Sequence, residues 1–253
     1  MGQAPAPAAP IAEGVSLEVD VENAQNAAMQ FLQEGKFKES LEKVAFIKSK
    51  LNKNFPQVLF LEGACHFNLG DFQAAATAFE TFVKEFPTGE NVNAVKLGLG
   101  RSYLKLNRAD EAIKVMKEAA QDPALRGEAG LLIAEHYNKS NQPDEALKLL
   151  EVIIADGVRS PEQIQAALMA ADIYVAKGDT EKAGDMLESV KGGGGSSGEN
   201  AIQLNNISFK LGDKMMEEKD FRKALASYQS VRRKAEVVKL MQDRIARTQA
   251  SLD

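Results

Sequence analysis

The sequence predicts an all-α fold built from repeated helical hairpins. Three observations support this prediction. One residue pattern recurs six times, the spacing between copies is nearly constant, and the last segment has the apolar period of an amphipathic helix. The composition, with 26% charged and 44% hydrophobic residues among 253, is ordinary for a globular protein.

The clearest copy of the pattern spans residues 59–87, "LFLEGACHFNLGDFQAAATAFETFVKEFP". Small, aromatic and turn residues stand in it at offsets that recur in the other copies. In this copy they are Leu59, Gly63, His66, Gly70, Asp71, Phe72, Ala75, Phe79, Phe82 and Pro87. One small residue can be followed through all six copies: Ser40, Ala75, Ala112, Ala146, Ala183 and Ala224. The steps between these residues are 35, 37, 34, 37 and 41 residues, which predicts a register kept along the chain.

This pattern resembles the tetratricopeptide repeat family, whose unit is a pair of antiparallel helices of about 34 residues in all. The resemblance covers roughly residues 20–232. It implies a right-handed superhelix of about six repeats, in which the small residue marks the closest approach of the two helices. The sequence departs from the family in having no tryptophan and in having Ser40 where alanine is usual.

The glycine-rich stretch at 191–198, "KGGGGSSG", could separate two domains or form a loop inside one. The repeat pattern resumes after it with a step only a few residues longer than the others. We therefore expect one solenoid over residues 20–253, with this stretch as a loop between repeats five and six. Ser196 and Glu199 form an S-x-x-E pattern that could cap the helix that follows.

The two ends of the chain differ from the repeats. Residues 1–19 are rich in alanine and proline, which predicts a disordered tail. Residues from about 234 to 252 place Val237, Met241, Ile245, Thr248 and Leu252 on one helical face. We expect a helix that caps the last repeat, and the alternative is a helix that binds a partner or a second copy.

No motif of a known catalytic or metal site is present, so we expect a non-enzymatic protein without cofactors. Cys65 is the one cysteine, which excludes an intrachain disulfide. His66 occupies a slot that tyrosine fills in the next three copies, and His136 has no cysteine or histidine nearby in the sequence. Neither histidine is expected to be catalytic or to bind a metal. The net charge of −5 argues against nucleic acid as a partner, and no apolar run is long enough to span a membrane.

The resemblance to this family also implies a partner-binding groove. It would be lined by certain positions on the first helix of each repeat. One such row is Phe60, Leu97, Leu131, Leu168 and Phe209, and another is Phe67, Leu104, Asn138, Val175 and Met216. Charged groups lie between these rows at Arg101, Glu135, Asp172 and Asp213, with Lys105 beside Leu104. The predicted site comprises Phe60, Phe67, Leu97, Arg101, Leu104, Lys105, Leu131, Glu135, Leu168, Asp172 and Phe209. An apolar row of this kind can bury a hydrophobic peptide or helix, or it can pack against neighbouring first helices as core.

Three functional hypotheses follow. The first is a scaffold or adaptor that binds a peptide or helix of a partner protein. The second is a structural component that forms homo-oligomers through the groove or the last helix. The third is an enzyme with a site built from scattered acidic residues, for which no reaction can be named.

The segment 79–119 resembles repeats of bacterial cell-envelope proteins, such as outer-membrane assembly lipoproteins and the periplasmic partner of the Tol–Pal system. It has a Phe-Pro that ends one repeat, a short polar link and then "LGRSYLKL". We therefore expect the periplasm or cell envelope of a bacterium, with an export signal removed. The alternative is a cytoplasmic protein.

Overall fold

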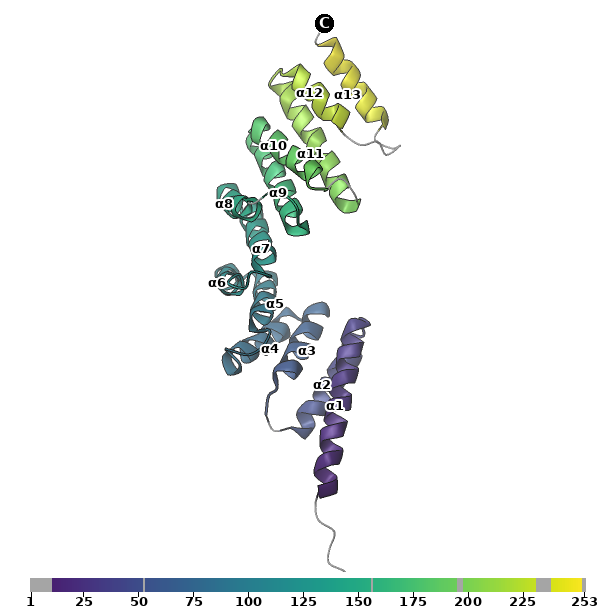
Figure 1. Cartoon of the computed structure of the whole chain (residues 1–253), viewed down its shortest axis with the longest axis vertical. Coiled ribbons are helices and arrows are strands. Elements are labelled where there is room, and N and C mark those ends of the chain that lie inside the picture. Colours follow the sequence, from purple (N-terminus) through teal and green to yellow (C-terminus); the bar gives the residue numbers. More distant parts are fainter. Residues whose placement is uncertain (1–10, 52, 156, 195–197, 231–237, 252–253) are drawn as a thin grey trace, which may run out of the picture. The chain divides into compact units, whose positions relative to one another are not determined.

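The computed structural model describes residues 11–51, 53–155, 157–194, 198–230 and 238–251. Within these ranges the chain forms thirteen α-helices and no strand, so the predicted all-α class is confirmed (Figure 1). None of the described helices is long and apolar enough to cross a lipid bilayer.

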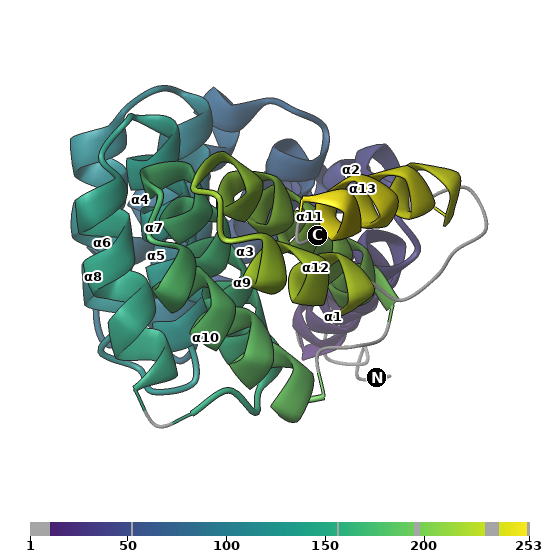
Figure 2. The same cartoon turned by 90° about the horizontal axis from the view of Figure 1, so that it is seen from above.

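The chain divides into two compact units, Met1–Leu125 and Arg126–Asp253. The helices of the first unit are α1 (Ile11–Gln33), α2 (Phe37–Lys50), α3 (Pro56–Asn68), α4 (Phe72–Glu85), α5 (Val92–Lys105) and α6 (Ala109–Ala119). Those of the second unit are α7 (Arg126–Lys139), α8 (Pro143–Ile154), α9 (Pro161–Lys177), α10 (Thr180–Gly192), α11 (Gly198–Glu217), α12 (Phe221–Ser230) and α13 (Val238–Ala250). Within each unit, consecutive helices pack in pairs, α1 with α2 through α11 with α12, as Figure 2 shows from above.

The tight turn inside each helical pair depends on one residue with a positive φ. These residues are Gly35, Gly70, Asn107, Asn141, Gly178 and Lys219. Glycine adopts this left-handed conformation without a Cβ clash, and asparagine tolerates it better than most residues do. An aspartate then caps three of the second helices, as where the Asp71 side chain accepts a hydrogen bond from the backbone N–H of Ala74. Glycine or asparagine thus accounts for the turn in five of the six described pairs, and Lys219 takes the same conformation in the sixth.

The two helices of a pair approach closely where a glycine of the first helix meets a large side chain of the second. The pairs are Gly63 with Phe79, Gly100 with Met116, and Gly212 with Tyr228. A Cβ atom added at any of these glycines would lie within 2.4 to 2.5 Å of that side chain, closer than packed atoms can come. The absence of a side chain at this position thus sets the distance between the helices.

Each unit is held together by apolar clusters between its helices. The first unit has one such cluster around α1, α2 and α3 and another around α3 to α6, and the second unit has one that reaches from α7 to α13. Ser40 fits into the first cluster because its buried hydroxyl donates a hydrogen bond to the carbonyl of Ala28 at 2.8 Å. This bond explains how serine replaces alanine at the crossing of the first pair without leaving a polar group unpaired.

The N-terminal end differs from the sequence-based expectation. Helix α1 begins at Ile11, so residues 11–19 are helical and the predicted disordered tail is wrong for this segment. Helix formation is compatible with the sequence, because Pro10 is the last proline before Pro56. Residues 1–10 lie outside the described part of the chain.

The glycine-rich stretch lies inside the second unit, between α10 and α11. Helix α10 continues through Gly192 and α11 begins at Gly198. The predicted cap residue Ser196 lies outside the described residues. A single solenoid over residues 20–253 stays a prediction.

We predict that Gly212→Ala lowers the free energy of unfolding by about 1–3 kcal/mol, because the new methyl group would clash with Tyr228. That ring cannot move aside easily, since it is 1% exposed and its hydroxyl donates to Asp213 at 2.6 Å. Urea denaturation followed by far-UV circular dichroism measures the change. Gly184→Ala in α10 is the matched control, because no heavy atom lies within 4 Å of its added Cβ and alanine favours a helix. Equal midpoints for Gly212→Ala and the wild type would contradict the proposed crossing constraint.

Candidate functional site

The predicted groove residues are distributed over both units and differ in burial. Leu97 and Leu168 are only 5% and 2% exposed. Lys105 is exposed. The remaining predicted residues are half-buried: Phe60, Phe67, Arg101, Leu104, Leu131, Glu135, Asp172 and Phe209. Three members of the apolar rows, Leu97, Leu168 and Val175, are thus core side chains. A partner could contact only the half-buried and exposed residues.

In the first unit, the first helices α1, α3 and α5 surround an apolar cavity of about 370 Å³. It is lined by Met29, Pro56, Gln57, Phe60, Phe82, Glu90, Asn91, Ala94 and Val95. Phe82 and Val95 are almost completely buried and close its floor, whereas Met29 and Phe60 are half-buried. A cavity of this size lies within the range that side chains or small ligands fill.

Local sequence explains how the cavity forms. Pro56 starts α3 at a position where a helix needs no backbone N–H, and Asn91, with φ of 64°, precedes α5 in the left-handed region. These two residues place the N-terminal ends of α3 and α5 at the rim of the cavity. Phe82 reaches the same space from α4, where it packs edge to face with Phe86 at 5.7 Å.

Sequence reasoning identified Phe60 but missed most of the lining. Gln57 and Ala94 lie three residues before Phe60 and Leu97, one helical turn away on the same face. That spacing was a usable signal for both residues. Glu90 and Asn91 lie in the link before α5, and no repeat position marks them.

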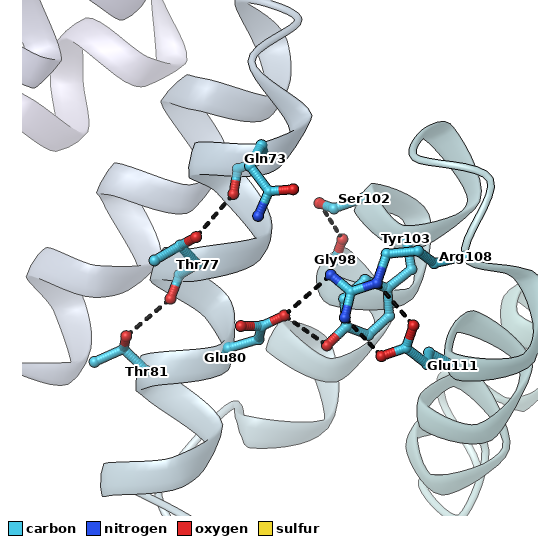
Figure 3. Close-up of polar contacts among 9 residues, drawn as sticks. All are labelled: Gln73, Thr77, Glu80, Thr81, Gly98, Ser102, Tyr103, Arg108 and Glu111. Carbon is cyan, nitrogen blue, oxygen red and sulfur yellow. Dashed lines mark hydrogen bonds and ion pairs between the residues drawn. The ribbon is translucent and has the colours of Figure 1, made fainter.

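A polar cluster holds α5 against α4 (Figure 3). The Tyr103 hydroxyl donates to Glu80 at 2.8 Å, and the Arg108 guanidinium lies 4.1 Å from the centre of the tyrosine ring. Arg108 also donates to Glu111 at 2.6 Å and lies 3.5 Å from Glu80. Because α5 carries Ala94 and Val95, this cluster helps to fix one wall of the cavity.

The second unit contains a corresponding pair, in which the Tyr174 hydroxyl donates to Glu151 at 2.5 Å. Both pairs have the same sequence spacing, and a lysine, Lys182, lies 5.2 Å from the centre of the Tyr174 ring. Burial and the neighbouring glutamate raise the pKa of each tyrosine to about 12. The neutral phenol is therefore favoured in the folded state.

The inner side of the second unit is more polar. A cavity of about 270 Å³ between α9 and α11 is lined by Gln165, Leu168, Met169, Asp172, Gln203, Asn206, Ile207 and Lys210. Lys210 of α11 donates to Asp172 of α9 at 2.6 Å. Asp172 thus forms an ion pair within its own chain.

Helix α13 covers the last predicted position, Phe209. The Arg244 guanidinium lies 5.5 Å from the centre of the Phe209 ring and 2.9 Å from Asp213. Thr248 of α13 is fully buried and contacts Met216 at 3.3 Å. Three groove positions of the sixth repeat are therefore occupied by the chain itself.

The position of α13 follows the repeat register. Lys210 and Arg244 are 34 residues apart, and each pairs with an aspartate of the preceding first helix, Asp172 or Asp213. Helix α13 packs mainly against α12, and its side chains Arg244 and Thr248 contact residues of α11. Residues 234–237 and 252 of the predicted capping helix, and the side chain of Met241, lie outside the described part.

Among the described residues, no group of three or more His, Cys, Asp or Glu side chains could hold a metal ion. His66 lies 3.7 Å from Asp71, and His136 lies beside Tyr137 with ring centres 6.3 Å apart. The Cys65 thiol is buried, and its burial raises its pKa. Its burial gives the Cys65 side chain a packing role.

Comparison with protein families and solved structures places this geometry among known repeats. Two family models described as tetratricopeptide repeat match residues 60–126 and 103–166. No curated protein sequence matches the chain.

Similar solved structures cover most of the chain at low sequence identity. PilF of Pseudomonas aeruginosa is 14% identical with a TM-score of 0.63, over 93% of this chain and 99% of PilF. MamA of Desulfovibrio magneticus RS-1 is 21% identical with a TM-score of 0.59, over 70% of this chain and 97% of the MamA chain. A tetratricopeptide repeat protein of Parabacteroides merdae is 13% identical with a TM-score of 0.56, over 90% and 99% of the two chains. At such identities these likenesses establish the fold alone.

We predict that Tyr103→Phe makes stability less dependent on pH in the alkaline range. The folded-state pKa of Tyr103 is raised from 10 to about 12, so its contribution is complete below about pH 10 and is lost as pH rises through about 12. Between about pH 9 and about pH 11 the wild type should lose about 1 kcal/mol more free energy of unfolding than the variant. Urea denaturation at both pH values measures the difference, and a phenolate absorbance titration reports the pKa. Parallel stability profiles would contradict the role of the Tyr103–Glu80 pair.

Proposed function

Because the chain is a tetratricopeptide repeat protein, we propose that it is a non-catalytic scaffold or adaptor. It binds a peptide or helix of a partner protein on the inner face of its first helices, and it works in a bacterial cell envelope. Proteins with this fold generally bind other proteins. The cavity around Phe60 indicates which surface of this chain would do so.

The cavity around Phe60 is the observation that carries the proposal. The residues that line the cavity are mainly apolar. Two of these residues, Met29 on α1 and Phe60 on α3, have half-buried side chains. Removing apolar surface of this kind from water contributes about 25 cal/mol per Å². A partner side chain that enters the cavity gains this energy without any rearrangement of the core.

The first unit is a better candidate than the second for this role. In the second unit, Leu168 is core, Asp172 is paired with Lys210, and Phe209 lies under Arg244. A partner would have to break these contacts before it could bind there. The cavity of the first unit is lined mainly by apolar side chains, whereas the one between α9 and α11 is lined mainly by polar ones.

The proposed location rests on the segment 79–119, which resembles repeats of bacterial envelope proteins. A cytoplasmic location is the alternative. Detection of the protein in periplasmic or in cytoplasmic fractions of the source cells distinguishes the two.

We predict that Phe60→Asp abolishes partner capture and leaves the fold intact. The aspartate places a charge in the apolar cavity, which should cost about 2 kcal/mol of binding energy or more, roughly a thirtyfold loss of affinity. Affinity capture from a lysate of the source organism, with quantitative mass spectrometry, measures the loss. Phe46→Asp is the matched control, because Phe46 is 39% exposed on α2 of the same unit and does not line the cavity.

Identical retained proteins for Phe60→Asp and Phe46→Asp would contradict the proposed site. Both variants must show the far-UV circular dichroism spectrum of the wild type for the comparison to count. Phe60 is only half-buried, so we expect both to meet this condition.

Self-assembly through the last helix is the alternative function. Ile245 of α13 packs against the apolar cluster of its own unit, and Thr248 beside it is buried there. These contacts favour a capping role over an interface between copies.

We predict that Ile245→Glu releases α13 without changing the mass of the particle. A carboxylate at this half-buried position should weaken α13 docking, which raises amide hydrogen exchange in α13 while α3 and α4 stay protected. Multi-angle light scattering before and after the substitution reports the mass. A dimer that Ile245→Glu converts to a monomer would support self-assembly instead.

A further inference from the structure

We infer that the occupant of the Phe60 cavity is a partner segment with one large apolar anchor residue and a lysine or arginine close to it. The inference rests on the proposed function and adds the chemistry of the partner. The anchor enters between Met29 and Phe60, and the cation faces Glu90.

The charge at the cavity rim carries this inference. Among the described residues that line the cavity, Glu90 alone is charged, and it is exposed. No ion pair joins Glu90 to a cation within the described part of the chain. Its carboxylate is therefore available to a cation of a bound segment, at the point where the anchor enters.

A basic group lies toward the other end of α5. Lys105 is exposed and follows Ala94 by 11 residues on the same helical face, about 16 Å further along the axis. Lys96 faces elsewhere, since it pairs with Glu118 at 2.9 Å. An exposed carboxylate, Glu90, thus precedes α5 and an exposed lysine, Lys105, ends it, which disfavours a segment whose cation points toward Lys105.

Charge pairs at the rim of an interface give selectivity and faster association more than affinity. The apolar anchor should supply most of the binding energy, and Glu90 should decide which anchor-bearing segments bind. This division of roles separates the inference from the proposed function in an experiment.

The test is a selection of random 12-residue peptides displayed on phage, with the full chain as bait and Phe60→Asp for counter-selection. We expect the enriched peptides to share a Phe, Leu, Met or Tyr with a Lys or Arg within four positions. Synthetic copies are then measured by fluorescence anisotropy against the wild type, Glu90→Lys and Glu42→Lys. Glu42 is the matched control, because it is an exposed carboxylate on α2 that does not line the cavity.

Glu90→Lys should weaken these peptides about three- to tenfold, and Glu42→Lys should change their affinity less than twofold. A glutamate in place of the peptide's cation should restore binding to Glu90→Lys, and the effect should shrink as salt is added. The inference would be overturned if peptides whose binding depends on Phe60 contained no excess of Lys or Arg, or if Glu90→Lys left their affinity unchanged. The proposed binding site at Phe60 would then still be supported. No peptide that depends on Phe60 would overturn both the inference and the proposed function.

Discussion

The close crossing of two helices at a residue without a side chain is the constraint on which each unit depends. At Gly63, Gly100 and Gly212 a large side chain of the second helix lies directly against the backbone of the first. This contact buries an aromatic or methionine side chain and fixes the pairing of the helices. Within each unit, the first helices of successive pairs are neighbours, as α1, α3 and α5 are in the first unit and α7, α9 and α11 are in the second.

In this arrangement, the same repeat position can line a cavity in one repeat and belong to the core in the next. Phe60 and Leu97 occupy equivalent places in adjacent repeats, yet Phe60 lines a cavity and Leu97 is 5% exposed. The difference comes from the neighbouring helices, which approach closely in one case and leave space in the other. An apolar inner position therefore indicates a binding surface only where the packing around it is incomplete.

Hydrogen bonds and ion pairs between neighbouring helices determine which charged groups remain open to a partner. Tyr103 with Glu80, and Tyr174 with Glu151, join a first helix to the helix before it. In the second unit, Lys210 and Arg244 use the inner carboxylates Asp172 and Asp213 for contacts within the chain. In the first unit, Glu90 stays exposed at the cavity, which is why the two inner faces differ in what they can offer a partner.

The sequence alone determined the all-α class and the six helical pairs, because these depend on contacts within about one repeat length. It also identified Phe60 as an inner position. Only the tertiary structure decided that α1 starts at Ile11, that Leu97 and Leu168 are core, and that α13 covers Phe209. It alone assembled the cavity from Met29, Phe82 and Glu90. The physical reason is that burial and free volume depend on how neighbouring helices pack, and a repeat pattern does not encode the distances between them.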